Sequence, residues 1–155
     1  MKAFAIAILT AAAALPAGSG PAGFELWKSA ELQAFEQKLS PKINAQKVAT
    51  QPLGSYGNHS VLMAHREGSG EAELHETQND VMVIESGEVT LVVGGTVVNP
   101  KTTAPHEIRG PSIKGGEKKP LAAGDVVHIA AKVPHQMLVE SGKQVTYFVV
   151  KIEAR

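Results

Sequence analysis

Four residues of metal-ligand type lie in two separate stretches of the chain. Glu73 and His75 are two residues apart on a predicted strand, so both side chains point to the same face. Asp80 opens the next predicted strand, and His135 follows a Val-Pro pair much later. Imidazole and carboxylate groups together accept several divalent ions, so this set predicts a site for Mn, Fe, Zn, Ni or Co. The structural alternatives are that Glu73 faces solvent and that Asp80 caps a turn.

We expect an apolar cavity beside these residues, because several strand positions on the inward side carry methionine. Methionine adapts to irregular ligands, and an apolar pocket with a few polar groups is typical of a small-molecule site. His65 shares strand parity with Met63, so it either lines this cavity or packs in the core. The candidate substrate-pocket residues are Met63, His65, Met82 and Met137. The sequence assigns no catalytic residue.

The remaining histidines have structural interpretations. His128 lies between two apolar residues and is expected to face outward, while His59 and His106 are expected at the surface. Residues 99–119 are expected to form a long loop, and loops of this length often act as lids or rims. Arg109, in that loop, either reaches over the barrel mouth to an anionic substrate or, more simply, is a solvated charge.

Short strands separated by glycine turns are predicted after residue 45. Strands at such spacing favour a sandwich or a barrel. Several of them are apolar on both faces, which indicates that a helix or a second subunit covers the outer face. A homodimer is therefore expected. The predicted strands are 58–66, 71–75, 81–85, 88–93, 96–99, 125–130, 135–140 and 144–152, with one of the turns at Ser86-Gly87.

One helix is predicted before the strands, over residues 29–39. Leu32, Phe35 and Leu39 form an apolar stripe at helical spacing. Ser29 is a suitable cap for its start, and the Ser40-Pro41 pair ends it because the residue before proline avoids helical geometry.

The N-terminus has the layout of a secretory signal peptide over residues 1–20, with cleavage expected within 17–22. Lys2 precedes an apolar run from Ala3 to Leu15, which is too short to span a bilayer. No second apolar stretch is long enough, so the mature chain is expected to be exported, to the periplasm or outside, without a membrane span. The expected organisation is a helical segment 24–45 followed by a barrel domain 46–155.

Composition excludes several function classes. The chain of 155 residues has 15 Lys and Arg against 15 Asp and Glu, so its net charge of zero argues against a nucleic-acid partner. The absence of cysteine excludes disulfides, thiolate metal sites and thiol catalysis. No phosphate-binding loop, nucleophile elbow or H-E-x-x-H motif is present.

At the ligand-type residues the chain resembles the cupin superfamily, over roughly residues 56–150. The first cupin motif is commonly G-x5-H-x-H-x(3,4)-E-x6-G. Here Glu73, His75, Asp80 and Gly87 stand at the first histidine, the second histidine, the glutamate and the last glycine, while the first glycine has no match. The resemblance implies an all-β jelly-roll barrel that holds a divalent metal inside.

The second cupin motif, commonly G-x5-P-x-G-x2-H-x3-N, is matched in part. Gly124 and His135 keep its spacing, while Ala130, Lys132 and Val139 replace the proline, the second glycine and the asparagine. The resemblance implies a metal-dependent enzyme of the oxygenase, isomerase, decarboxylase or lyase type acting on a small organic molecule. The alternatives are a non-catalytic exported module that binds a small ligand at a degenerate metal site, and a structural protein that dimerises through its strands.

Overall fold

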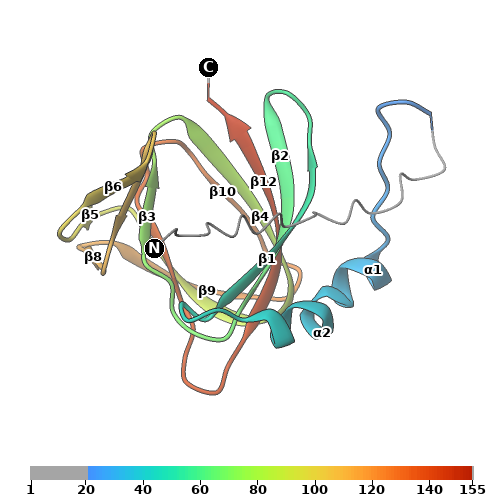
Figure 1. Ribbon diagram of the computed structural model, residues 1–155. Helices are drawn as coiled ribbons and strands as arrows, with labels where there is room; N and C mark the ends of the chain where they lie inside the picture. Colours follow the sequence, from blue (N-terminus) through green and yellow to red (C-terminus); the bar gives the residue numbers. More distant parts are fainter. Residues whose placement is uncertain (1–20, 155) are drawn as a thin grey trace, which may run out of the picture.

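A computed structural model describes residues 21–154, and Figure 1 shows a curled antiparallel β-sheet with short helices on its outside. The predicted signal peptide, residues 1–20, lies outside the described residues. Within residues 21–154, no helix is long and apolar enough to cross a membrane.

The main sheet has the strand order β1-β2-β12-β4-β11-β3-β7-β6, and β9 and β10 also pair with β4. A small second sheet joins β5 to β8. The curled sheet confirms the prediction of an all-β barrel. The strands are β1 (Val48–Ser55), β2 (His59–Arg66), β3 (Ala72–His75), β4 (Gln78–Val93), β5 (Thr96–Val97), β6 (Lys101–Ala104), β7 (Glu107–Gly110), β8 (Ile113–Lys114), β9 (Glu117–Ala122), β10 (Val126–Ile129), β11 (His135–Leu138) and β12 (Val145–Glu153).

Strand β4 is continuous, where the sequence predicted two strands with a turn at Ser86-Gly87. Gly87 has a φ of 78°, and a Cβ there would clash with the carbonyl oxygen of Gln144. A register shift in the β4–β12 pairing lies beside it, between Thr146 and Tyr147. The first half of β4 pairs with β10 and β12, and the second half pairs with β9 and β11. Gly87 therefore marks a bend within one strand that carries the chain from one side of the barrel to the other.

Alternation along β12 defines the inside of the barrel. Val145, Tyr147 and Val149 belong to the buried interior cluster, whereas Phe148 packs against a second cluster beneath the helices. Burying an apolar side chain of this size contributes about 1.5–3 kcal/mol, so the interior cluster is a main source of stability. Its members are Ala64, Met82, Ile84, Val89, Leu91, Ile129, Met137, Val139, Val145, Tyr147 and Val149.

The predicted helix is divided into α1 (Ser29–Gln33) and α2 (Phe35–Leu39), followed by the 3-10 helix η1 (Ser40–Lys42). Ala34 separates the two but keeps right-handed helical dihedrals, so the interruption is local. The start is capped by Glu31, whose carboxylate accepts a hydrogen bond from the Lys28 backbone NH, and not by Ser29. Helix α2 contacts β1 and β2, and α1 contacts β4, so helices do cover part of the outer face of the sheet (Figure 1).

The segment 99–119 is not a loop. It contains β6, β7, β8 and the start of β9, and β7 pairs with β3. These strands are short, polar and interrupted by proline and glycine, so they lack the apolar alternation that identifies a strand in a sequence. The correction matters because β7 lies beside the strand that carries Glu73 and His75.

Candidate metal centre

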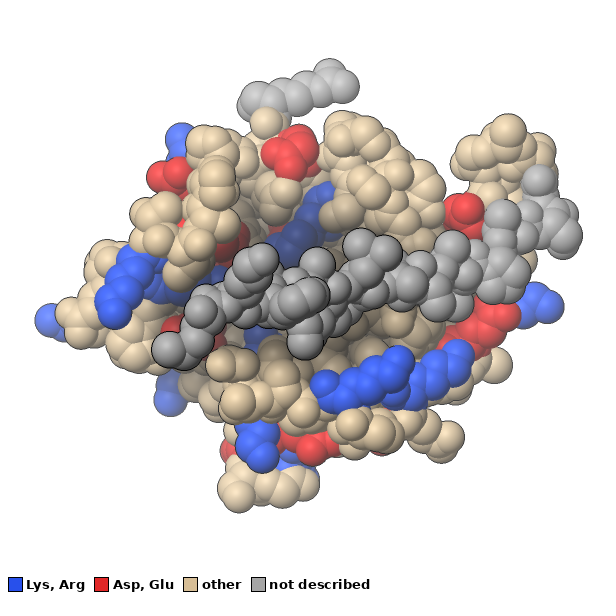
Figure 2. All heavy atoms as spheres, viewed as in Figure 1, with Lys and Arg blue, Asp and Glu red and all other residues tan. Residues whose placement is uncertain are grey.

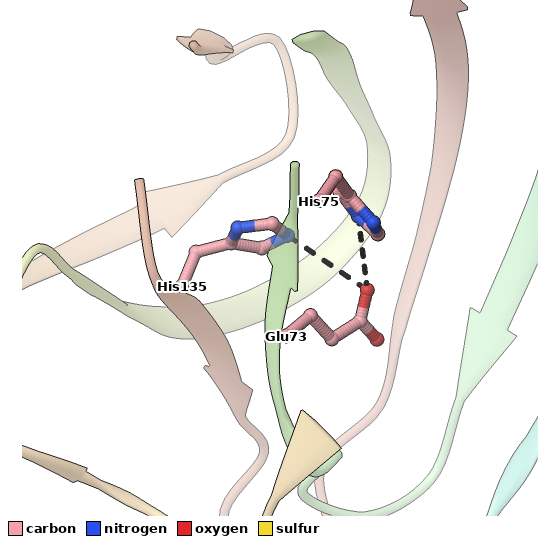
Figure 3. A group of neighbouring side chains, drawn as sticks. All are labelled: Glu73, His75 and His135. Atoms are coloured by element: carbon pink, nitrogen blue, oxygen red, sulfur yellow. Dashed lines mark ion pairs between the residues drawn. The ribbon is translucent and has the colours of Figure 1, made fainter. Parts of the chain in front are cut away.

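The four predicted ligand residues come together inside the barrel. Strand β3 carries Glu73 and His75, and β11 brings His135 opposite Glu73 because the two strands pair at these residues. Figure 3 shows the side chains of Glu73, His75 and His135 converging, with both imidazoles directed at the carboxylate. Ligand atoms of these three residues all lie within 4.8 Å of one another. The centroids of the two imidazole rings are 5.2 Å apart.

Asp80, from β4, lies against the same two imidazoles. Its Oδ2 is 3.2 Å from His75 Nε2 and 3.5 Å from His135 Nε2. Glu73 Oε2 is 3.5 Å and 3.8 Å from the same two nitrogens. Two imidazole nitrogens therefore face two carboxylates in a mostly buried space, which is the donor set expected for a divalent cation.

The surroundings of His135 show whether these residues are suited to hold a metal ion. Its side chain is 3 % exposed, and its Nε2 is buried with no hydrogen-bond partner among the described residues. Its Nδ1 lies 3.2 Å from the Val133 carbonyl oxygen, which leaves Nε2 free of a proton if Nδ1 donates. Buried polar atoms are nearly always paired, so an Nε2 without a hydrogen-bond partner that is aimed at two carboxylates fits a role as a cation ligand.

Glu107 is a site residue that the sequence did not identify. Its Oε2 accepts a hydrogen bond from Nδ1 of His75, because β7 pairs with β3 and sets these two residues opposite each other. A carboxylate at this nitrogen fixes the ring orientation and directs Nε2 to the centre. No sequence signal was available, since the flanking segment did not read as a strand.

Arg109 is also part of the site, so its interpretation as a solvated loop charge is wrong. Its guanidinium donates to Glu73 Oε1 at 2.6 Å and to Glu107 Oε1 at 2.5 Å. The side chain is only 29 % exposed. Arg109 thereby holds Glu73 and Glu107, two of the three carboxylates that contact His75, in fixed positions, as a planar guanidinium does well.

Lys151 completes the cluster from β12, where it pairs with Asp80 in the β4 register. Its Nζ donates to Asp80 Oδ1 at 2.9 Å and lies 3.0 Å from His75 Nε2. The inward alternation of Val145, Tyr147 and Val149 extends to Lys151, and this was the available signal. The ammonium group therefore lies at the same nitrogen that a metal would use.

Burial and the charges of this cluster shift the pKa of both Glu73 and His75. Burial disfavours a charged His75, but hydrogen bonds with Asp80, Glu107 and Glu73 outweigh it and raise the pKa to about 10. Burial would raise the pKa of Glu73, yet the hydrogen bond with His75 and the charge of Arg109 lower it to about 2. The metal-free site is therefore a network of ionised groups.

The pKa values of Asp80 and His135 are also shifted by burial and by neighbouring charges. The pKa of Asp80 is lowered, because its hydrogen bond with His75 and the charge of Lys151 outweigh burial. The pKa of His135 is lowered because burial dominates over the charges of Glu73 and Asp80. His135 is thus the neutral imidazole of the pair, in the form that binds a metal.

The predicted pocket residues divide between two faces. Met82 and Met137 lie in the interior cluster, two residues from Asp80 and His135 on the same strand faces. Met63 and His65 instead face outward beneath the helices. Met63 packs against Phe35, Leu39 and Ala49, and His65 bonds to Thr146 Oγ1 and Glu67. These two residues are therefore outside the barrel interior, which corrects their predicted position.

The other histidines lie away from the centre. His128 and His106 are exposed, as predicted, and His59 is half-buried, with its ring stacked on Tyr56 at a centroid distance of 5.1 Å. On the face drawn in Figure 2, the Lys and Arg side chains are interspersed with Asp and Glu side chains, in agreement with the balanced composition.

No model of a protein family matches the chain, and no curated protein matches it. Similar solved structures include the protein TT1209 from Thermus thermophilus, at 21% identity, covering 73% of this chain and 90% of that chain, with a TM-score of 0.53. Pac13 of Streptomyces, described as a nucleoside dehydratase, is 10% identical over 72% of this chain and 74% of that chain, with a TM-score of 0.51. A cupin protein from Bacteroides fragilis is 18% identical over 64% of this chain and 69% of that chain, with a TM-score of 0.45.

These likenesses concern the fold. The barrel of Pac13 and the curled sheet of this chain superimpose over most of the described residues, at an identity too low to transfer an activity. The comparisons thus confirm the barrel fold that the resemblance implied, and a His/Glu cluster that can hold a metal ion lies inside the barrel.

Proposed function

We propose that this protein is a metal-dependent enzyme of the cupin type, which binds one divalent ion through Glu73, His75 and His135 and acts on a small organic molecule. Asp80, which lies against both imidazoles and bonds to Lys151, would be available as a fourth ligand. The reaction is of the oxygenase, isomerase or lyase type. The signal-peptide layout of residues 1–20 supports an exported enzyme, in the periplasm or outside.

The observation that carries this proposal is the buried, unpartnered Nε2 of His135. Leaving such an atom without a partner costs about 1–3 kcal/mol, which a folded protein retains only for a function or a ligand. The atom points at Glu73 and Asp80, and a second imidazole nitrogen lies beside them. A bound cation would satisfy all four groups together.

When bound, the metal would supply a Lewis acid that polarises an oxygen of the substrate. The chain supplies the surroundings. Glu107 orients His75, and Arg109 balances the charge of Glu73 and Glu107. Met82 and Met137 form an apolar wall next to the ligand residues, which excludes water and favours a substrate with an apolar part.

Metal analysis of the purified mature protein tests the proposal. We expect about one divalent ion per chain after loading with Mn, Fe, Zn, Ni or Co, and loss of this ion in His135→Gln and His75→Gln. His128→Gln is the matched control, because His128 is exposed on β10. A wild-type protein that retains none of these ions after loading would overturn the proposal, as would equal retention by all three variants.

A second candidate, a non-catalytic module that binds a small ligand without metal, is favoured by one observation. The Lys151 ammonium already contacts His75 and Asp80, so the cluster has a cation of its own. Thermal-shift screening of the metal-free protein distinguishes the two: stabilisation by an organic ligand with no metal and no turnover favours the module. Sedimentation of the mature chain tests the proposed homodimer, and a monomer at micromolar concentration counts against it.

A further inference from the structure

Two cations are candidates for one place in the barrel. The Nζ of Lys151 lies 3.0 Å from His75 Nε2 and 3.2 Å from Asp80 Oδ2. His75 Nε2 is also a member of the triad that can hold a metal, and Asp80 Oδ2 is 3.5 Å from His135 Nε2. Lys151 therefore contacts two groups of the centre directly, while the Nε2 of His135 has no hydrogen-bond partner among the described residues.

We propose that the Lys151 ammonium is an internal competitor of the metal ion: it holds the metal-free site together, lowers the affinity for metal, and withdraws when the ion binds. This inference rests on the proposed metal-binding function. Lys151 would then set the affinity of the site for metal, and therefore the metal concentration at which the site fills.

The electrostatic reason is that like charges at such short range repel strongly in a mostly buried site. A divalent ion at His75 Nε2 would lie within a few ångströms of an ammonium that has no anion other than Asp80 in contact among the described residues. Asp80 cannot fully neutralise Lys151 and bind the metal at once. Removing the ammonium therefore frees the Asp80 carboxylate and leaves the space beside His75 Nε2 to the ion.

Unlike Arg109 and Arg66, Lys151 can move its charged group out of the site. Arg109 is held by two carboxylates, and Arg66 donates to the hydroxyl of Tyr147. Lys151 has a flexible side chain that is 23 % exposed, near the end of β12, so its ammonium can reach solvent by rotation alone. Withdrawal of Lys151 needs no movement of the barrel.

Titration calorimetry with Zn²⁺ or Co²⁺ at one fixed pH tests the inference. We expect Lys151→Met, which keeps the length of the side chain without its charge, to bind the ion at least about tenfold more tightly than wild type. Lys151→Arg keeps the charge and should bind no more tightly than wild type. Lys143→Met is the control, because Lys143 pairs with Glu88 at the surface.

The outcomes separate this inference from the proposed function. If wild type binds the ion and Lys151→Met binds it equally or less tightly, the competition is rejected while the metal site stands. If neither protein binds any ion, both ideas are rejected. Binding by Lys151→Met alone, with little by wild type, supports the competition in its strongest form.

A second measurement needs no variant and covers the case in which Lys151→Met fails to fold. Reductive methylation of wild-type protein, followed by peptide mass mapping, reports how accessible each lysine is. We expect metal to speed the methylation of Lys151 at least about threefold, because withdrawal frees the amine. Exposed lysines such as Lys143 should not change. An unchanged or slower reaction at Lys151 in metal-loaded protein would reject the inference.

Discussion

Glu107 and His75 form a partly buried hydrogen bond between neighbouring strands, with the Nδ1 of His75 as donor and Oε2 of Glu107 as acceptor. The bond lies on the side of the ring away from Glu73 and Asp80. It fixes which nitrogen of His75 is directed at the centre, because the other nitrogen is occupied. Strand β7, which the sequence did not reveal, is therefore part of the site.

Weakening this bond should lower the affinity for metal without removing a ligand. We expect Glu107→Gln to reduce the affinity by about 10–100-fold, since such supporting partners have effects of this size. Calorimetric titration measures it. Glu117→Gln is the control, because Glu117 is exposed and pairs with Lys119 at the surface. An affinity within about twofold of wild type would show that Glu107 does not position His75.

The stability of the metal-free protein should fall as the pH rises above neutrality. The pKa of His75 is about 10 in the folded protein against its ordinary value of 6.5, so folding favours its protonated form. This contribution is complete below pH 6.5 and is lost as the pH rises to about 10. The free energy of unfolding, measured by urea denaturation between about pH 6.5 and pH 9.5, should decrease. In His75→Gln this decrease should be smaller, and an equal decrease would contradict the assignment.

The expected loss of stability at low pH has a separate cause. The pKa of Glu73 is lowered from 4.5 to about 2, so its contribution is present above pH 4.5 and lost as the pH falls towards 2. The lowered pKa of His135 adds a loss of stability below its ordinary value of 6.5. Greatest stability of the metal-free protein is therefore expected near pH 6.5, and a curve that keeps rising to about pH 9 would contradict this.

Gly87→Ala should destabilise the protein more than an ordinary glycine substitution. Gly87 has a φ of 78° and no space for a Cβ, whereas Gly142 has a φ of 79° with nothing within 4 Å of a Cβ. Backbone strain alone costs about 1–2 kcal/mol at each position. Urea denaturation should show a larger loss of unfolding free energy in Gly87→Ala than in Gly142→Ala, because the Cβ at position 87 must displace the Gln144 carbonyl or straighten β4. Equal losses in the two variants would show that β4 bends without help from Gly87.

Met137→Ala should lower both the stability of the protein and its affinity for an apolar ligand. Met137 is 5% exposed in the interior cluster, and truncation of such a residue costs about 2–5 kcal/mol. Met137→Leu conserves volume and should cost less than about 1.5 kcal/mol. Urea denaturation of both variants, with metal content measured in parallel, checks this. A loss of metal in Met137→Leu would indicate that the apolar wall also positions His135.

The candidate ligand residues could be predicted because their spacing along the chain already determines which side chains lie on the same strand face. Glu73 and His75 share a face in any strand, whatever the rest of the fold does. His135 was identified from its distance to Gly124 in a motif. These inferences depend on local periodicity and motif spacing, and the structure brings the residues together.

The inward face of β2 could not be predicted in the same way. Val61 and Met63 on one face and Leu62 and Ala64 on the other are all apolar, because the barrel interior covers one face and the helices help to cover the other. Alternation then carries no information about which face is inside. Met63 and His65 were placed inside for this reason, and they lie beneath α2.

Lys151 and Glu107 were missed, and Arg109 was assigned to a loop, because charged residues on short strands normally face water. Their partners across the sheet, Asp80, His75 and Glu73, show that they point inward. Such pairings link residues more than 30 positions apart, so no local pattern identifies Glu107 or Arg109, and the alternation along β12 was the one local signal for Lys151.

Anomalous diffraction from crystals of the mature protein loaded with cobalt tests the central claim most directly. We expect one strong peak enclosed by Glu73 Oε2, His75 Nε2 and His135 Nε2, with the Lys151 ammonium moved away from His75. A map of well-ordered, cobalt-saturated crystals with no peak among these three atoms, or with cobalt only at surface residues, would contradict it.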